Sequence, residues 1–202
     1  MKQILSLILM MALAACHDQP SPSRYGDSTV AKKDSLKTEA FYPLTQYIQD
    51  QISYVDSTPF AIEKHTYING KRVDSVLIDR QEFNKLAAEF LKPDLNDSKI
   101  KQLYIESSYQ DLTINSVTFD YTTQDHSQEL QQADVLLNPE TKKVKNIIFR
   151  KNRLVGDTSV SINGLWKNNM NFQLNYTFQP AKGKTQTKQI KVIWDRPMVS
   201  DY

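Results

Sequence analysis

Two stretches of the chain repeat apolar side chains at three- and four-residue steps, a spacing that places them on one face of a helix. The first stretch covers residues 40 to 55 and has Pro43 in its first turn, where a missing N–H is tolerated. The second follows Asp79 and Glu82, which resemble a capping box, and it stops at Lys92-Pro93 because a proline pushes the preceding residue out of helical geometry. We therefore expect two amphipathic helices, with apolar faces made by Phe41, Leu44, Ile48, Ile52 and Val55 and by Phe83, Leu86, Ala87, Phe90 and Leu91.

Most of the remaining chain alternates apolar and polar residues, which predicts β-strands. Asn69-Gly70 is a strong hairpin signal between residues 61–68 and 71–78. Further strands are expected within 100–121 and in two more hairpins, 130–137 with 144–150 and 172–178 with 190–194. Consecutive hairpins form an antiparallel sheet with one buried and one solvated face. The predicted fold is α+β, an antiparallel sheet with both helices packed on its apolar face.

The chain opens with an apolar run, from Ile4 to Ala15, that follows the single charge of Lys2. The run is shorter than the roughly 20 residues that span a bilayer, and it suits the apolar part of a secretory signal. It ends at Cys16, the only cysteine in the chain. The segment Leu13-Ala14-Ala15-Cys16 resembles the lipobox of bacterial lipoproteins. That resemblance implies cleavage before Cys16 and acylation of its thiol; the alternative is an ordinary secretory signal with an incidental cysteine.

These features predict four segments and a location. Residues 1–15 are the expected signal peptide, and 16–37 are the expected lipidated cysteine and flexible tether, since Pro, Ser, Asp and Lys dominate there. Residues 38–195 are expected to form one domain, followed by a tail at 196–202. The lipobox implies attachment to a membrane of the bacterial envelope. We expect the outer membrane, because His17 stands where an aspartate favours retention in the inner membrane.

Charge and motifs narrow the classes of function. The 25 Lys and Arg nearly balance the 23 Asp and Glu, which argues against a nucleic-acid partner. The sequence contains no HExxH, no GxSxG, no glycine-rich phosphate loop and no cysteine cluster, so we expect no metal and no cofactor. The favoured hypothesis is a non-catalytic binding or scaffolding module. Its partner would be an envelope protein, a peptide or a glycan.

The Asn69-Gly70 hairpin suggests one alternative function, a hydrolase. A two-residue turn would set His65 opposite Asp74, with Glu63, Tyr67 and Arg72 on the same face. A histidine beside a carboxylate is half of many acid–base sites. The same residues also suit a solvated strand face with a weak ion pair. His65, Tyr67, Arg72 and Asp74 are therefore candidate binding residues as well as a candidate catalytic pair.

Aromatic residues provide a further candidate surface. Trp166 occurs in a polar, turn-like stretch at 163–169, where it either folds back onto the sheet or anchors a partner. The other aromatic side chains fill the core or form a stacking platform; they are Tyr104, Tyr109, Tyr121, Tyr176 and Trp194. A last alternative is a carrier of an apolar ligand, which requires a continuous cavity between the sheet and the helices.

Overall fold

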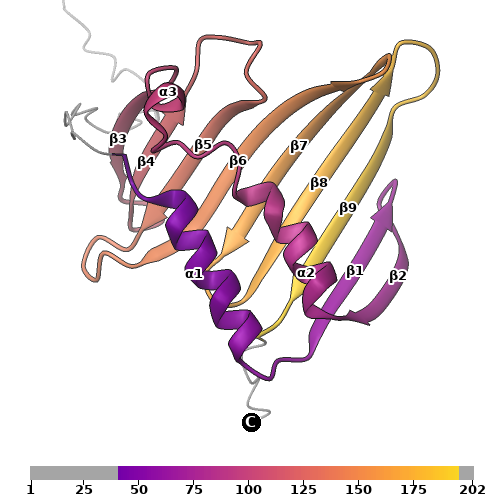
Figure 1. Ribbon diagram of the computed structural model, residues 1–202, viewed down its shortest axis with the longest axis horizontal. Coiled ribbons are helices and arrows are strands. Elements are labelled where there is room, and N and C mark those ends of the chain that lie inside the picture. Colours follow the sequence, from indigo (N-terminus) through magenta and orange to yellow (C-terminus); the bar gives the residue numbers. More distant parts are fainter. Residues whose placement is uncertain (1–40, 196–202) are drawn as a thin grey trace, which may run out of the picture. The chain divides into compact units, whose positions relative to one another are not determined.

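The structure is a computed structural model in which residues 41–195 are described (Figure 1). All of these residues belong to the unit formed by Ala31–Tyr202. The expected signal peptide, Cys16, the tether and the C-terminal tail lie outside the described residues. Within the described part, no helix is long and apolar enough to cross a membrane.

Nine antiparallel strands form one open sheet in the order β2-β1-β9-β8-β7-β6-β5-β4-β3. β1 pairs with β2, and each strand from β3 to β9 pairs with the next along the chain; β9 pairs with β1, so that β2 and β3 form the two edges. The helical elements are α1 (Leu44–Ser57), α2 (Arg80–Ala87), η1 (Ala88–Phe90) and α3 (Ser98–Lys101). The strands are β1 (Ile62–Ile68), β2 (Lys71–Ile78), β3 (Ile105–Asp111), β4 (Ser116–Thr122), β5 (Leu130–Leu137), β6 (Val144–Val155), β7 (Thr158–Lys167), β8 (Asn171–Pro180) and β9 (Gln186–Ile193).

The predicted fold class is confirmed in part. The antiparallel sheet of hairpins is present, but strands dominate and helices make up a small share of the described residues. The predicted turn around Trp166 is wrong, because residues 158–167 form strand β7, in which Trp166 pairs with Ile147 and Phe172. Of the polar residues that suggested a turn, Asn163 and Lys167 are exposed on this strand, whereas Asn168 and Asn169 belong to the turn that follows it.

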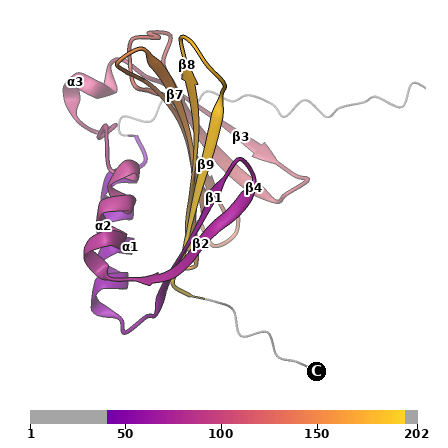
Figure 2. The ribbon, with the colours of Figure 1, turned by 90° about the vertical axis from the view of Figure 1, so that its right-hand side faces the viewer.

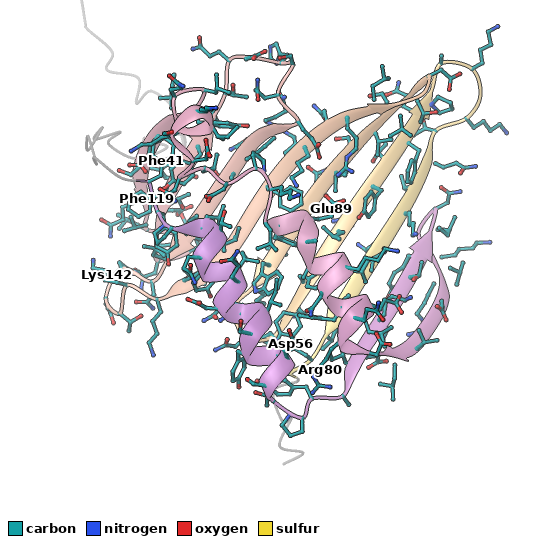
Figure 3. All side chains as sticks on the ribbon, in the orientation of Figure 1. Phe41, Asp56, Arg80, Glu89, Phe119 and Lys142 are labelled. Atoms are coloured by element: carbon teal, nitrogen blue, oxygen red, sulfur yellow. The ribbon has the colours of Figure 1, made fainter. Side chains whose placement is uncertain are left out.

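Local interactions fix the two longer helices. The Asp79 carboxylate accepts a hydrogen bond from the Glu82 N–H at 2.8 Å, which caps the start of α2 as the sequence predicted. The Arg80 guanidinium donates to the Asp56 carbonyl at 2.9 Å and thereby links α2 to the end of α1 (Figure 3). The Tyr47 hydroxyl donates to Asn168 Oδ1 at 2.7 Å, which ties α1 to the turn after β7.

The core lies between these helices and the sheet. Helix α2 and the following η1 form one segment, residues 80–90, which we call the α2 segment. Its Phe83 and Phe90 contact Trp166 at ring-centroid distances of 6.5 and 5.1 Å. The Phe149 ring covers Gly164 so closely that a Cβ at Gly164 would lie 2.2 Å from the ring. Glycine is therefore required there for packing.

A small void within this layer bears on the carrier alternative. The void between the α2 segment and the sheet, beside Leu44, Phe90 and Phe149, measures about 10 Å³. That volume is close to the space of a single water molecule. The packing thus gives the carrier alternative no support.

Candidate functional site

The two faces of the sheet differ in their cover. In Figure 2, α1 and α2 lie on one side of the sheet, while the β1–β2 and β3–β4 hairpins extend toward the other side. No helix or strand formed by residues 41–195 covers that second side, which we call the open face. Side chains on neighbouring strands that are paired in register point to the same face, so the pairing identifies the residues of the open face.

One in-register line of side chains crosses the open face over seven strands. It starts at the edge strand β2 and ends on β5, and nearly every member is an amide or a guanidinium. We call it the polar row; its members are Arg72, Tyr67, Gln189, Asn175, Asn163, Arg150 and Gln132.

Hydrogen bonds hold several side chains of the polar row in place. Gln189 Nε2 donates to Asn175 Oδ1 at 2.7 Å, and Gln173 Nε2 donates to the same oxygen at 3.1 Å. Arg150 donates to Gln132 Oε1 at 3.0 Å. Because these contacts restrict the side chains before any partner arrives, less conformational entropy is lost when a partner binds.

A hollow lies at the β1–β9–β8 end of the polar row. Its volume is about 370 Å³, within the range of small-molecule sites. On the open face the lining combines the Tyr67 ring with the amide and hydroxyl groups of Asn175, Thr177, Thr187 and Gln189. Gly70, Tyr176 and Lys188 complete it. Beside the polar row, Thr187, Thr177 and Ser161 are paired in register, so small side chains flank its larger ones.

The predicted pairing of His65 with Asp74 is wrong. A register shift between Thr66 and Tyr67 adds one residue to β2, so His65 pairs with Ser75 and Asp74 pairs with Thr66. Adjacent positions on a strand face opposite sides, so Asp74 points away from the face that carries His65. The predicted pairing was counted outward from the two-residue Asn69-Gly70 turn, and the turn alone does not indicate this bulge.

His65 instead contacts a carboxylate of its own strand. His65 Nε2 lies 2.6 Å from Glu63 Oε1, and the Ser75 hydroxyl donates to the same oxygen at 3.2 Å. Burial lowers the pKa of His65, and the positive charges of Arg72 and Lys191 lower it further. The Ser75 hydroxyl thus bonds to the Glu63 carboxylate and not to His65. His65 is therefore not placed to activate Ser75 as a nucleophile.

A carboxylate pair lies beside the far end of the polar row. Asp120 and Asp134 are paired across β4 and β5, and Gln132 Nε2 donates to Asp120 Oδ1 at 3.1 Å. Burial, together with the neighbouring Asp120 carboxylate, raises the pKa of Asp134 to about 6. A raised pKa means that this group contributes stability that is present at low pH and is lost as the pH rises through 6.

Replacing Asp134 with asparagine should therefore stabilise the protein at high pH. We expect Asp134→Asn to raise the free energy of unfolding by about 1 kcal/mol at pH 8, a value reduced by partial exposure of the carboxylate. The gain should disappear near pH 4, where the wild-type carboxyl is protonated. Urea unfolding at both pH values measures it, with the exposed Asp157→Asn as control. An equal gain at both pH values would contradict the charged-pair explanation.

The structure buries the predicted aromatic anchor. Trp166 has no exposed surface, so it offers nothing to a partner. Tyr104, Tyr121 and Trp194 are buried as well, which confirms the core alternative for these residues. Tyr109 remains 37 % exposed on the edge strand β3. Of the candidate binding residues, Tyr67, Arg72 and His65 lie on the open face, whereas Trp166 and Asp74 do not.

A larger hollow of about 510 Å³ lies among α3, the segment before it and the β4–β5 loop. Its carboxylates already hold local structure: Asp94 Oδ1 accepts from Thr45 at 3.1 Å, and Asp97 caps α3. Glu129 forms an ion pair with Arg153 at 3.0 Å. The open face presents the polar row and its hollow to solvent, and we therefore take it as the candidate site.

Sequence reasoning missed the central members of the polar row. Asn163, Asn175 and Gln189 occupy the outward positions of their strands, and an excess of amides at such positions is the signal that could have found them. Within the described residues, no group of three or more His, Asp and Glu side chains could hold a metal ion. Comparison of the chain with protein-family models, with curated proteins and with solved structures finds no match among any of them.

Proposed function

We propose that this chain is a lipid-anchored protein of the bacterial envelope, and that its domain is a non-catalytic binding module that contacts its partner through the open face. The lipobox at Leu13–Cys16 supports the anchor. An acylated Cys16 would attach the protein to a membrane, with the outer membrane favoured by His17. Stable anchoring takes more than one acyl chain, and a triacylated cysteine supplies three.

The polar row is the observation that carries the binding role. A solvated sheet face usually bears scattered charges, whereas here amides and guanidinium groups follow one line. Hydrogen bonds of 2.7 to 3.1 Å orient four of them, Gln189, Asn175, Arg150 and Gln132. Such preorganised polar groups are what a binding surface requires. A hydrolase built on His65 and Asp74 has less support, because the two side chains face opposite sides of the sheet.

The proposal is tested by the melting temperature of the full chain in native envelopes and after detergent extraction. A partner present at 100 times its Kd adds about 2.7 kcal/mol, which raises the melting temperature by roughly 5 °C or more. Asn163→Trp blocks the centre of the open face and should remove this gain relative to wild type. Ser53→Trp, on the exposed side of α1, should keep it.

Detergent extraction affects wild type and both variants alike. Differences among them in the envelope-dependent change of melting temperature therefore report on the open face. The same envelope-dependent gain in wild type and Asn163→Trp would contradict binding there. The intact mass of the extracted protein tests the anchor: we expect a chain that starts at an acylated Cys16. An unmodified thiol would contradict it.

A further inference from the structure

We propose that the open face binds an acidic polysaccharide, with the sugar chain lying along the polar row and a carboxylate of the sugar bound at the row's cationic positions. This inference rests on the proposed function, because it names the chemical class of the partner that the open face takes. Its argument combines the length of the row, the hydrogen-bonding groups that it presents and the placement of its charges.

The length of the polar row suits an extended chain. Its seven members lie on seven adjacent strands from β2 to β5. Six strand spacings of about 4.8 Å give a track of about 29 Å. Small side chains at Thr187, Thr177 and Ser161 border one side of this track, which leaves space beside it for a flat, chain-like ligand.

The side chains match the chemistry of sugars. A sugar hydroxyl both donates and accepts, and each amide offers two donors and an acceptor. Asn163 is exposed at the centre of the row, and Gln189 and Asn175 are half-buried in the hollow. The Tyr67 ring adds a surface with an apolar body and a polar tip. These groups suit a polar ring better than an apolar side chain.

A peptide is a poorer fit for this surface. Peptides bind to sheets by adding a strand at a free edge, or by placing apolar side chains in pockets. Apart from Arg72 on the edge strand β2, the polar row crosses strands that are already paired on both sides. The hollow beside Tyr67 is lined on the open face mainly by amide and hydroxyl groups.

Positive charge is concentrated at the hollow end of the row. Arg72 pairs with Tyr67 at the edge of the sheet, and its side chain is exposed on the open face. Lys191 pairs with His65 on the open face, two residues along each strand from Gln189 and Tyr67 of the hollow. The effect of Arg72 and Lys191 on the His65 pKa reflects the same positive field. Glu63, the nearest carboxylate on this face, already contacts His65 at 2.6 Å.

A second cation lies farther along the row. Arg150 is exposed, and its bond to Gln132 at 3.0 Å leaves other donors of the guanidinium available. Guanidinium groups bind carboxylates through two parallel hydrogen bonds. Cations at both Arg72 and Arg150, separated by amides, therefore match a polymer in which carboxylates recur between hydroxyl-bearing rings. A uronate-containing polysaccharide has this chemistry.

Titration calorimetry on the full chain in detergent tests the inference. The ligands are oligogalacturonate, a neutral maltooligosaccharide of equal length and phosphatidylglycerol vesicles. We expect the acidic oligosaccharide to bind at least about tenfold more tightly than the neutral one, since each charge-assisted hydrogen bond contributes about that factor. Asn163→Trp should abolish binding. Arg72→Gln and Arg150→Gln should each weaken it about tenfold, and Ser53→Trp should leave it unchanged.

Three results would overturn the inference: equal affinity for the neutral oligosaccharide, binding only to the vesicles, or no binding of any saccharide. The melting temperature in native envelopes distinguishes failure of this inference from failure of the proposed function. If no saccharide binds while the envelope still stabilises wild type but not Asn163→Trp, the open face has a different partner and the proposed function stands. If both effects are absent, both proposals fail.

Discussion

Replacing Trp166 with alanine is expected to lower the free energy of unfolding by about 4 kcal/mol. The side chain has no exposed surface, and its ring centroid lies 5.2 Å from Phe172, 5.1 Å from Phe90 and 5.3 Å from Trp194. Removing the indole leaves a cavity among aromatic rings that cannot collapse to fill it. Urea unfolding followed by circular dichroism measures the change.

The control for this prediction is Leu154→Ala on β6. Leu154 is 74 % exposed, so its truncation should change the free energy of unfolding by less than about 0.5 kcal/mol. A loss below about 1 kcal/mol for Trp166→Ala would place the indole outside the core. It would then revive the interpretation of Trp166 as a surface anchor.

Replacing Glu89 with glutamine is expected to cost about 3 kcal/mol, because it leaves a buried cation without its counterion. Lys151 is 3 % exposed and its Nζ lies 3.5 Å from Glu89 Oε2, which also binds Arg153 at 2.7 Å. Glu89 lies on η1, at the end of the α2 segment (Figure 3). The ammonium lies 4.7 Å from the centre of the Phe149 ring, an interaction that does not replace the carboxylate.

The double variant Glu89→Gln/Lys151→Met tests this explanation. Methionine removes the buried charge at similar volume, so the double variant should recover much of the stability that the single variant loses. The exposed Glu140→Gln serves as the control and should have little effect. Strictly additive losses from the two substitutions would show that Glu89 and Lys151 do not interact.

Features encoded within a few residues were predictable from the sequence. The Asp79 cap, the apolar stripe of α2 and the Asn69-Gly70 turn each depend on neighbours in the chain, and the structure contains all three. Both central residues of that turn have positive φ, 48° and 79°, as an Asn-Gly turn requires. Because these features depend on residues close in the sequence, they can be predicted without knowledge of tertiary contacts.

Features that depend on distant pairing were not predictable. The bulge between Thr66 and Tyr67 displaced Asp74, because one additional residue reverses the face of every later side chain. Strand β7 was missed because its outward polar residues resembled a turn. The burial of Trp166 could be predicted only with knowledge of its partners on the neighbouring strands. The polar row joins residues from β2 to β5, and its members become neighbours only when the order and register of seven strands are known.

Accessibility of the open face in the envelope tests the central claim most directly. The chain has one cysteine, Cys16, which the proposed anchor would block, so an engineered cysteine reports on a single position. Ser161→Cys places a thiol beside the polar row, and Ser53→Cys places one on the exposed side of α1. The measurement is the rate of maleimide labelling in native envelopes and after detergent extraction. A face occupied nine-tenths of the time should label about tenfold more slowly. The account predicts this slowing at Ser161→Cys only; equal rates at Ser161→Cys in both preparations, or slowing at Ser53→Cys instead, would contradict it.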